Sequence, residues 1–242
     1  MDGAGHFGRH RGWADRVADE LAGRVPDFRY ANLAIRGRLV QQVTAEQVPT
    51  AVAMRPDLVS FAAGVNDCLR SGFDVHAAST AVERAVRSLR DGGSDVLLFA
   101  FGNPARRSVL MGLVKERVWA YDEALRAIAR HYGCYLVDFW DVAVFDEDPY
   151  WDEDRLHLSP AGHALAARAA LQALGLDSGD WRTPRPIHRK APLERTVSHA
   201  TWAKMHLAPW VVRRVQGRSS GDAVGPKWPT LTKWPPAASP GQ

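Results

Sequence analysis

A carboxylate and a histidine stand three residues apart in the run Asp154-Arg155-Leu156-His157. A histidine that accepts a proton during hydrolysis needs a partner that holds its other ring nitrogen as N–H, and Asp154 could supply that partner from a tight loop. Two residues after His157, the run Ser159-Pro160 is typical of the N-cap and the first position of a helix. The pair is therefore a candidate for hydrolytic chemistry, and an ordinary structural loop is the alternative. We expect His163, inside that helix, to be packed or on the surface.

Asn66 and Gly37 each follow an expected strand. Asn66 lies in Gly64-Val65-Asn66-Asp67, directly after the apolar run 58–63. Open α/β sheets place their sites at the carboxyl ends of the strands, which favours a functional Asn66. Gly, Asn and Asp are also common turn residues, so a plain turn is the alternative. Gly37 follows the expected strand 28–34 and is a weak signal by itself. We expect Asp67 and Asn32 to order these two loops.

Strand and helix signals alternate through the first 175 residues. The apolar runs 58–63 and 96–101 are typical of buried parallel strands, and each is followed by a stretch with helical periodicity. Strands separated by helices of this length predict βαβ units, with a parallel sheet covered on both faces. The expected helices are 12–22, 41–54 (interrupted near Pro49), 75–89, 113–132 ending at Gly133, and 159–174; the expected strands are 28–34, 58–63, 96–101 and 135–139.

The amino-acid composition changes at Ser178. Nine of the fifteen prolines and five of the nine tryptophans lie beyond it. We expect residues 1–177 to form the main domain and 178–242 a C-terminal extension, with one helical stretch at 196–216 and a frayed end after Gly217. The extension carries 11 Lys and Arg against 3 Asp and Glu, a surplus of +8, which leaves −4 on the rest of a chain whose net charge is +4. Its cations and tryptophans are expected to lie along the acidic body, and binding of nucleic acid is the less favoured alternative.

The order Gly37, then Gly64-Val65-Asn66-Asp67, then Asp154-Arg155-Leu156-His157 resembles three of the four sequence blocks of the SGNH/GDSL hydrolase family. The resemblance covers about residues 8–175. It implies a three-layer α/β/α, flavodoxin-like fold and a serine esterase or lipase without metal or cofactor. It also implies His157 as general base, Asp154 as its orienting partner, and Gly37 and Asn66 as oxyanion donors. The implied substrate is a small-molecule ester: a small acyl ester, a lysophospholipid or an acetylated sugar.

The first block of that family, a Gly-Asp-Ser run after an N-terminal strand, is missing. No serine precedes Ser60, which lies in an expected buried strand, and Ser159 is an expected helix cap. Cys68, close to Asn66, is expected to be buried and inert. We expect a start placed too late in the gene, which would leave the 242-residue form inactive; a non-catalytic binding module of the same fold is the alternative. In the family fold the absent strand runs between 28–34 and 58–63, so both strands are expected to have unpaired backbone N–H and C=O groups, with a gap between them.

Composition limits the remaining possibilities. At 46% hydrophobic and 24% charged residues, the 242-residue chain is predicted to form a globular domain with a sizeable core. No apolar run is long enough for a membrane helix. Cys68 and Cys134 are too few for a disulfide framework and favour a reducing, cytoplasmic location. The sequence does not indicate an oligomeric state.

Overall fold

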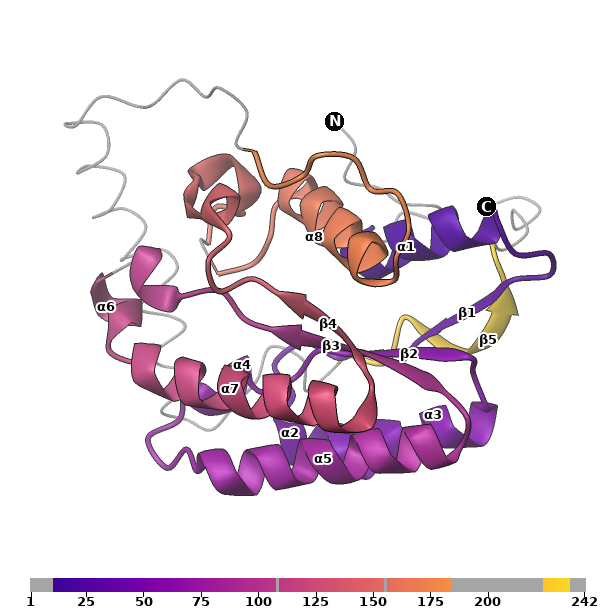
Figure 1. Ribbon diagram of the computed structural model, residues 1–242, viewed down its shortest axis with the longest axis horizontal. Helices are drawn as coiled ribbons and strands as arrows, with labels where there is room; N and C mark the ends of the chain where they lie inside the picture. Colours follow the sequence, from indigo (N-terminus) through magenta and orange to yellow (C-terminus); the bar gives the residue numbers. More distant parts are fainter. Residues whose placement is uncertain (1–10, 108, 155, 184–223, 236–242) are drawn as a thin grey trace.

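The computed structural model describes residues 11–107, 109–154, 156–183 and 224–235 (Figure 1). In this part of the chain a central sheet carries helices on both faces, so the expected three-layer α/β/α architecture is confirmed. None of the described helices is long and apolar enough to cross a membrane.

Three parallel strands form the central sheet in the order β2-β3-β4. They are β2 (Leu58–Phe61), β3 (Asp95–Ala100) and β4 (Tyr135–Asp138). Five of the six residues of β3 are buried, as expected for a strand with neighbours on both edges and helices on both faces. The continuous apolar run in β3 therefore reflects a buried parallel strand, as predicted from the sequence.

The helices α5 (Val75–Asp91) and α7 (Lys115–Tyr132) cover one face of this sheet. Asp74 caps α5 by accepting hydrogen bonds from two backbone N–H groups, and Gly133 ends α7 at φ +61°. The segment expected at 41–54 divides into α2 (Val40–Gln42), the π-helix η1 (Val43–Gln47) and α3 (Val48–Met54). Pro49, at the second position of α3, explains the interruption, because proline has no backbone N–H for the ladder.

The helices α1 (Trp13–Ala22) and α8 (Pro160–Ala173) pack side by side on the opposite face. Trp13 reaches the sheet, and its ring centroid lies 4.6 Å from that of Phe99 on β3. Shorter elements connect the strands at the carboxyl end of the sheet: α4 (Val65–Cys68), η2 (Pro104–Arg106), α6 (Val109–Gly112), η3 (Ala143–Asp146) and η4 (Asp148–Tyr150).

A separate two-stranded sheet holds β1 (Arg29–Asn32), which pairs antiparallel with β5 (Trp228–Lys233). Within the described residues no ladder joins β1 to β2. The expectation of unpaired backbone groups is therefore wrong for β1, which has β5 as its strand partner. The expectation of a frayed end after Gly217 is wrong for β5, because residues 228–233 find a strand partner in β1.

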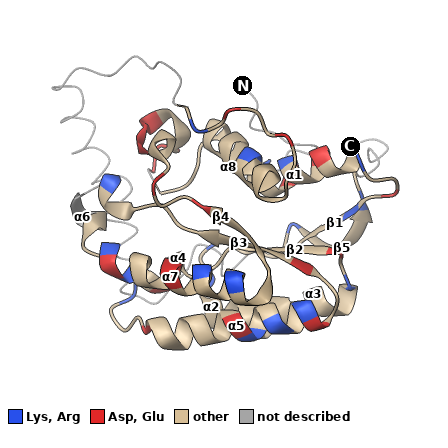
Figure 2. Ribbon diagram, in the orientation of Figure 1, with Lys and Arg blue, Asp and Glu red and all other residues tan. Residues whose placement is uncertain are grey.

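Two described lysines of the C-terminal extension contact the body of the protein. Lys227 pairs with Asp15 at 2.6 Å, and Lys233 pairs with Asp27 at 2.9 Å. Arg182 lies over the ring of Trp181, which is itself buried in the core beneath α8. Figure 2 shows Lys and Arg interspersed with Asp and Glu along α5 and α7. The expected helical stretch 196–216 lies outside the described residues.

Candidate functional site

Asp154 and His157 are in direct contact. Their side chains meet at 2.5 Å between Asp154 Oδ2 and His157 Nδ1, while Asp154 Oδ1 accepts the backbone N–H groups of Leu156 and His157 at 2.9 Å each. The carboxylate thus holds both the loop and the imidazole ring. With Nδ1 as the donor to Asp154, Nε2 is the ring nitrogen that remains for proton transfer. The His157 side chain is 62% exposed and that of Asp154 28% exposed, so the ring is open to a substrate.

The electrostatics of this pair favour a charged carboxylate. Partial burial works to raise the pKa of Asp154, but the hydrogen bonds from the His157 side chain and from the two backbone N–H groups outweigh it. The net result is a pKa below the ordinary value for an aspartate. An ionised Asp154 both orients the imidazole and stabilises its protonated form.

The helix that follows the pair has the predicted cap. Ser159 Oγ accepts the backbone N–H of Gly162 at 3.2 Å and donates to the carbonyl of Pro149 at 2.6 Å. Gly162 packs so closely that a Cβ there would lie 2.0 Å from the Tyr150 carbonyl oxygen. His163 is half-buried, and its Nδ1 accepts the backbone N–H of Trp13 at 3.2 Å, so it packs between helices as expected. The start of α8 therefore anchors the Asp154–His157 loop.

The Asn66 and Gly37 loops are bound to each other. Asn66 Nδ2 donates to the carbonyl of Arg38 at 3.3 Å, and both carboxylate oxygens of Asp67 lie within 3.2 Å of the backbone N of Val40. Asp67 thus orders a loop, as predicted, although the loop is the one that carries Gly37. Gly37 itself has φ +78°, a conformation that favours glycine.

The loop that carries Gly37 is also supported by Asn32, at the end of β1. Its Oδ1 accepts the backbone N–H of Ala34 at 3.0 Å, and its Nδ2 donates to the hydroxyl of Tyr30 at 2.9 Å. This is the loop-ordering role expected from the sequence. Figure 1 shows α4 and the segment before α8 both at the end of the sheet where β2, β3 and β4 terminate. Within the described residues no hydrogen bond joins the Asp154–His157 loop to α4. The predicted site residues therefore form two groups: Asp154 with His157, and Asn66 with the Gly37 loop.

The structure corrects the prediction for Ser60. We expected its side chain to be buried, yet Ser60 is exposed on β2. The neighbouring β1 belongs to another sheet, which leaves this edge of β2 uncovered among the described residues. No hydrogen bond in the described part of the chain links Ser60 to His157. Cys68 matches its prediction: it is fully buried, and burial raises the pKa of its thiol to about 12.

A set of polar residues on α7 binds the strand ends, and the sequence did not predict these contacts. Tyr121 donates its hydroxyl to the carbonyl of Ala63 at 3.0 Å, just after β2. The next residue, Asp122, accepts the backbone N–H of Phe101 at 2.9 Å, just after β3. One turn later Arg126 makes two hydrogen bonds to the carboxylate of Asp138, at 2.7 and 3.0 Å, on β4. Helical periodicity marked these positions as parts of α7, but it does not reveal their partners.

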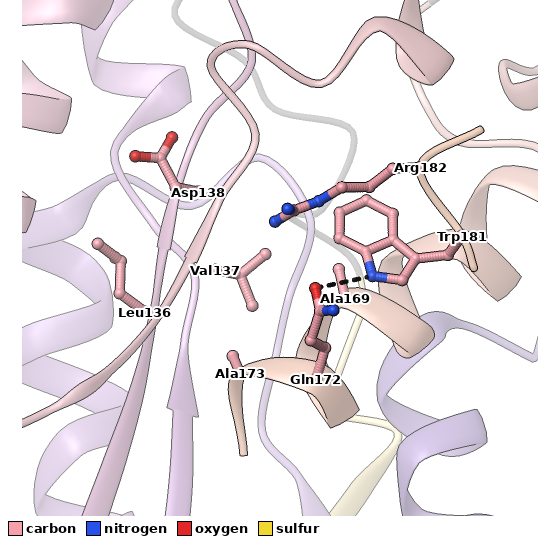
Figure 3. Close-up of a pocket in the computed structure, with 8 residues that line it drawn as sticks. All are labelled: Leu136, Val137, Asp138, Ala169, Gln172, Ala173, Trp181 and Arg182. Atoms are coloured by element: carbon pink, nitrogen blue, oxygen red, sulfur yellow. Dashed lines mark hydrogen bonds between the residues drawn. The ribbon is translucent and has the colours of Figure 1, made fainter. Parts of the chain in front are cut away.

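A small cavity of about 120 Å³ lies beside β4, and Asp138 is one of the residues that line it (Figure 3). Its polar groups are engaged with one another: Trp181 Nε1 donates to Gln172 Oε1 at 3.1 Å, and the Arg182 guanidinium stacks on the Trp181 ring at 4.9 Å. None of the four predicted site residues lines it, so the cavity is not the candidate site. Among the described residues no group of three His, Cys, Asp or Glu is placed to hold a metal ion.

Comparison with solved structures shows the same fold in several other proteins. An alpha/beta hydrolase, LAE5, from the metagenome of Lake Arreo, Spain, is 24% identical with a TM-score of 0.59, covering 72% of this chain and 86% of its own. The acetylxylan esterase Axe2 from Geobacillus stearothermophilus is 23% identical with a TM-score of 0.60, covering 76% and 89%. TesA is 23% identical with a TM-score of 0.58, covering 67% and 87%.

Comparison with protein families gives an assignment more specific than the shared fold. No curated protein matches the chain. The model of the GDSL-like lipase/acylhydrolase family matches residues 1–165, which is more than half of the sequence and includes all four predicted site residues. The chain therefore belongs to the GDSL-like lipase/acylhydrolase family.

Proposed function

We propose that this chain carries the acid–base and oxyanion parts of a serine esterase for small-molecule esters. The contact of 2.5 Å between Asp154 and His157, with the imidazole open to solvent, is the observation that carries this proposal. Family membership supports ester hydrolysis as the reaction. The bound pair of loops at Gly37 and Asn66 supports the position of the oxyanion donors.

In the proposed reaction His157 Nε2 takes the proton of a serine hydroxyl as the serine oxygen attacks the ester carbonyl. The backbone N–H of Gly37 and the side-chain amide of Asn66 donate to the oxygen that becomes negative. Each donor of this kind contributes about 10²–10³ in rate in other hydrolases. His157 then returns the proton to the leaving alcohol, and water releases the acyl group by the same route in reverse.

Among the described residues no serine is hydrogen-bonded to the His157 side chain, so the proposed reaction needs a nucleophile from elsewhere. We propose that it belongs to a Gly-Asp-Ser block encoded ahead of Met1. Under this proposal the 242-residue form is inactive alone. Among the substrates considered, an acetylated sugar has the most specific support, because one relative of the same fold is an acetylxylan esterase.

The test is hydrolysis of short p-nitrophenyl esters by a protein extended upstream to include that block. We expect turnover by the extended form and none by the 242-residue form. His157→Gln in the extended form should reduce kcat by about 10³-fold, because general acid–base catalysis is typically worth 10²–10⁴. His163→Gln is the matched control, since His163 packs against Trp13, and it should retain kcat within a few-fold.

Two results would contradict the proposal. The first is serine-dependent turnover by the 242-residue form. The second is an extended form without activity, which would favour the non-catalytic binding module. Upstream DNA without an in-frame Gly-Asp-Ser codon run would support the same alternative.

A further inference from the structure

Tyr121 on α7 contacts the turn that leads into Asn66 in two ways. Its hydroxyl donates to the carbonyl of Ala63 at 3.0 Å. Its ring also fills the space next to Gly64, where a Cβ would lie only 2.2 Å from ring carbons of Tyr121. The same Gly64 has φ +114°, a conformation that side chains rarely adopt. Gly64 and Tyr121 therefore fit together as a matched pair.

The turn held in this way determines where Asn66 points. The carbonyl of Gly64 accepts the backbone N–H groups of Asp67 and Cys68 at 2.9 and 3.0 Å, which forms the single turn of α4 around Asn66. A shift of Gly64 would move α4 and, with it, the contacts of Asp67 and Asn66 to the Gly37 loop. The position of the candidate oxyanion donors thus depends on one residue of a neighbouring helix.

The environment of Tyr121 makes this contact stable. The side chain is fully buried, and burial raises the pKa of the phenol well above its usual range, so the hydroxyl stays a proton donor. Phe73 packs against the ring with centroids 6.2 Å apart. Asp122, the next residue of α7, holds the backbone N–H after β3, which keeps the helix in register with the strand ends.

We propose that Tyr121 is the positioning residue of the candidate oxyanion site, acting through Gly64 to orient Asn66. The catalytic part of this inference rests on the proposed function, whereas the orientation of Asn66 can be measured without any activity. A residue that fixes donor geometry affects the rate of the chemical step more than it affects substrate binding.

The first experiment uses NMR on the 242-residue chain. Tyr121→Phe keeps the ring and removes the hydroxyl, and we expect it to shift the side-chain amide signals of Asn66 and the backbone signals of Gly64. Tyr132→Phe is the matched control: Tyr132 lies on the same helix, and its hydroxyl bonds Arg87 and Glu83 instead. Unchanged Asn66 signals in Tyr121→Phe, or equal shifts in the control, would overturn the proposal.

Hydrogen exchange in the unsubstituted chain covers the case in which Tyr121→Phe does not fold. We expect the amides of Asp67 and Cys68 to exchange only when α7 itself opens. Exchange of these amides while α7 remains protected would show that Tyr121 does not hold the turn.

The kinetic arm uses the extended, active protein. Tyr121→Phe is expected to lower kcat by about 10- to 100-fold and to leave KM within twofold, since misplacement by about 1 Å can cost 10²-fold. A rise in KM at constant kcat would overturn the positioning role. Complete absence of esterase activity in the extended wild type would instead contradict the proposed function, and the NMR result would still decide the role of Tyr121.

Discussion

The strands of this protein are held in two different ways. The carboxyl ends of β2, β3 and β4 are bound by three residues of a single helix: Tyr121, Asp122 and Arg126. In contrast, β1 pairs with β5, a strand from about 200 residues later in the chain, and no ladder joins it to β2 within the described residues. The candidate site draws on both regions, because Asn66 follows β2 and Gly37 follows β1.

The difference shows how a loop can be placed without a continuous sheet. Neighbouring strands normally set the positions of their end loops through shared hydrogen bonds. Here the Asn66 loop takes its position from α7, and the Gly37 loop takes its position from the Asn66 loop, through Asp67 and Val40. Damage to the first region should therefore propagate to the second, while damage to β5 should reach the Gly37 loop only through β1 and Asn32.

The largest effect is expected for Gly64→Ala. A Cβ at this position meets the Tyr121 ring at 2.2 Å, in addition to the cost of φ +114°. Together these should lower the free energy of unfolding by about 3 kcal/mol or more, as measured by urea denaturation. Gly93→Ala is the control, because Gly93 has φ +88° and open space around it, and it should cost only about 1–2 kcal/mol. Equal losses of unfolding free energy for the two substitutions would mean that the Tyr121 ring adds no steric cost at Gly64.

A smaller effect is expected at the β1–β5 end. Lys227→Met leaves the carboxylate of Asp15, which is only 3% exposed, without its cation. The remaining donors, the backbone N–H of Gly12 and the hydroxyl of Tyr30, compensate in part, so we expect a loss of about 2 kcal/mol in urea denaturation.

Lys233→Met is the matched control for this ion pair. Lys233 and Asp27 are both largely exposed, and exposed pairs contribute little. No change in the urea midpoint is expected for the control. A midpoint lowered equally by both lysine substitutions would refute the distinction between the buried and the exposed pair.

The last effect is a pH dependence of stability at Asp122, rather than a loss of stability at one pH. Burial raises the pKa of this carboxyl to about 7, against the opposing hydrogen bond from Phe101 N–H and the charge of Arg126. A folded-state pKa above the unfolded value of about 3.9 means that Asp122 lowers stability progressively as pH rises from about 4 to about 7. Asp122→Asn removes this titration. The difference in Tm, wild type minus variant, should therefore fall between pH 5 and pH 7 and then level off; a constant difference would show that Asp122 is ionised throughout.

Sequence reasoning succeeded where the determinants are local. The Asp154–His157 contact spans three residues of a loop, and the Ser159 cap follows it directly, so spacing and residue type were enough to predict both. The run that forms β3 was equally visible, because its apolar continuity reflects burial between helices.

Other features depend on residues far apart in the chain. β5 contains Pro229, ends beside Pro235, and pairs with a strand whose sequence gives no sign of this partner. Ser60 looked buried because its neighbours are apolar, but the structure leaves its side chain exposed on β2. Tyr121 and Asp122 read as ordinary helix positions, since a buried polar side chain is explained only by the strand end that it binds.

We propose that His157 acts as the general base for the serine of a Gly-Asp-Ser block. Labelling with a fluorophosphonate probe, followed by mass spectrometry of the modified peptide, tests it most directly. We predict that the extended protein is labelled at the serine of its Gly-Asp-Ser block, that His157→Gln abolishes labelling, and that the 242-residue chain is not labelled. Labelling of the 242-residue chain at Ser60, which is exposed on β2, or His157-independent labelling of the extended form would contradict the account.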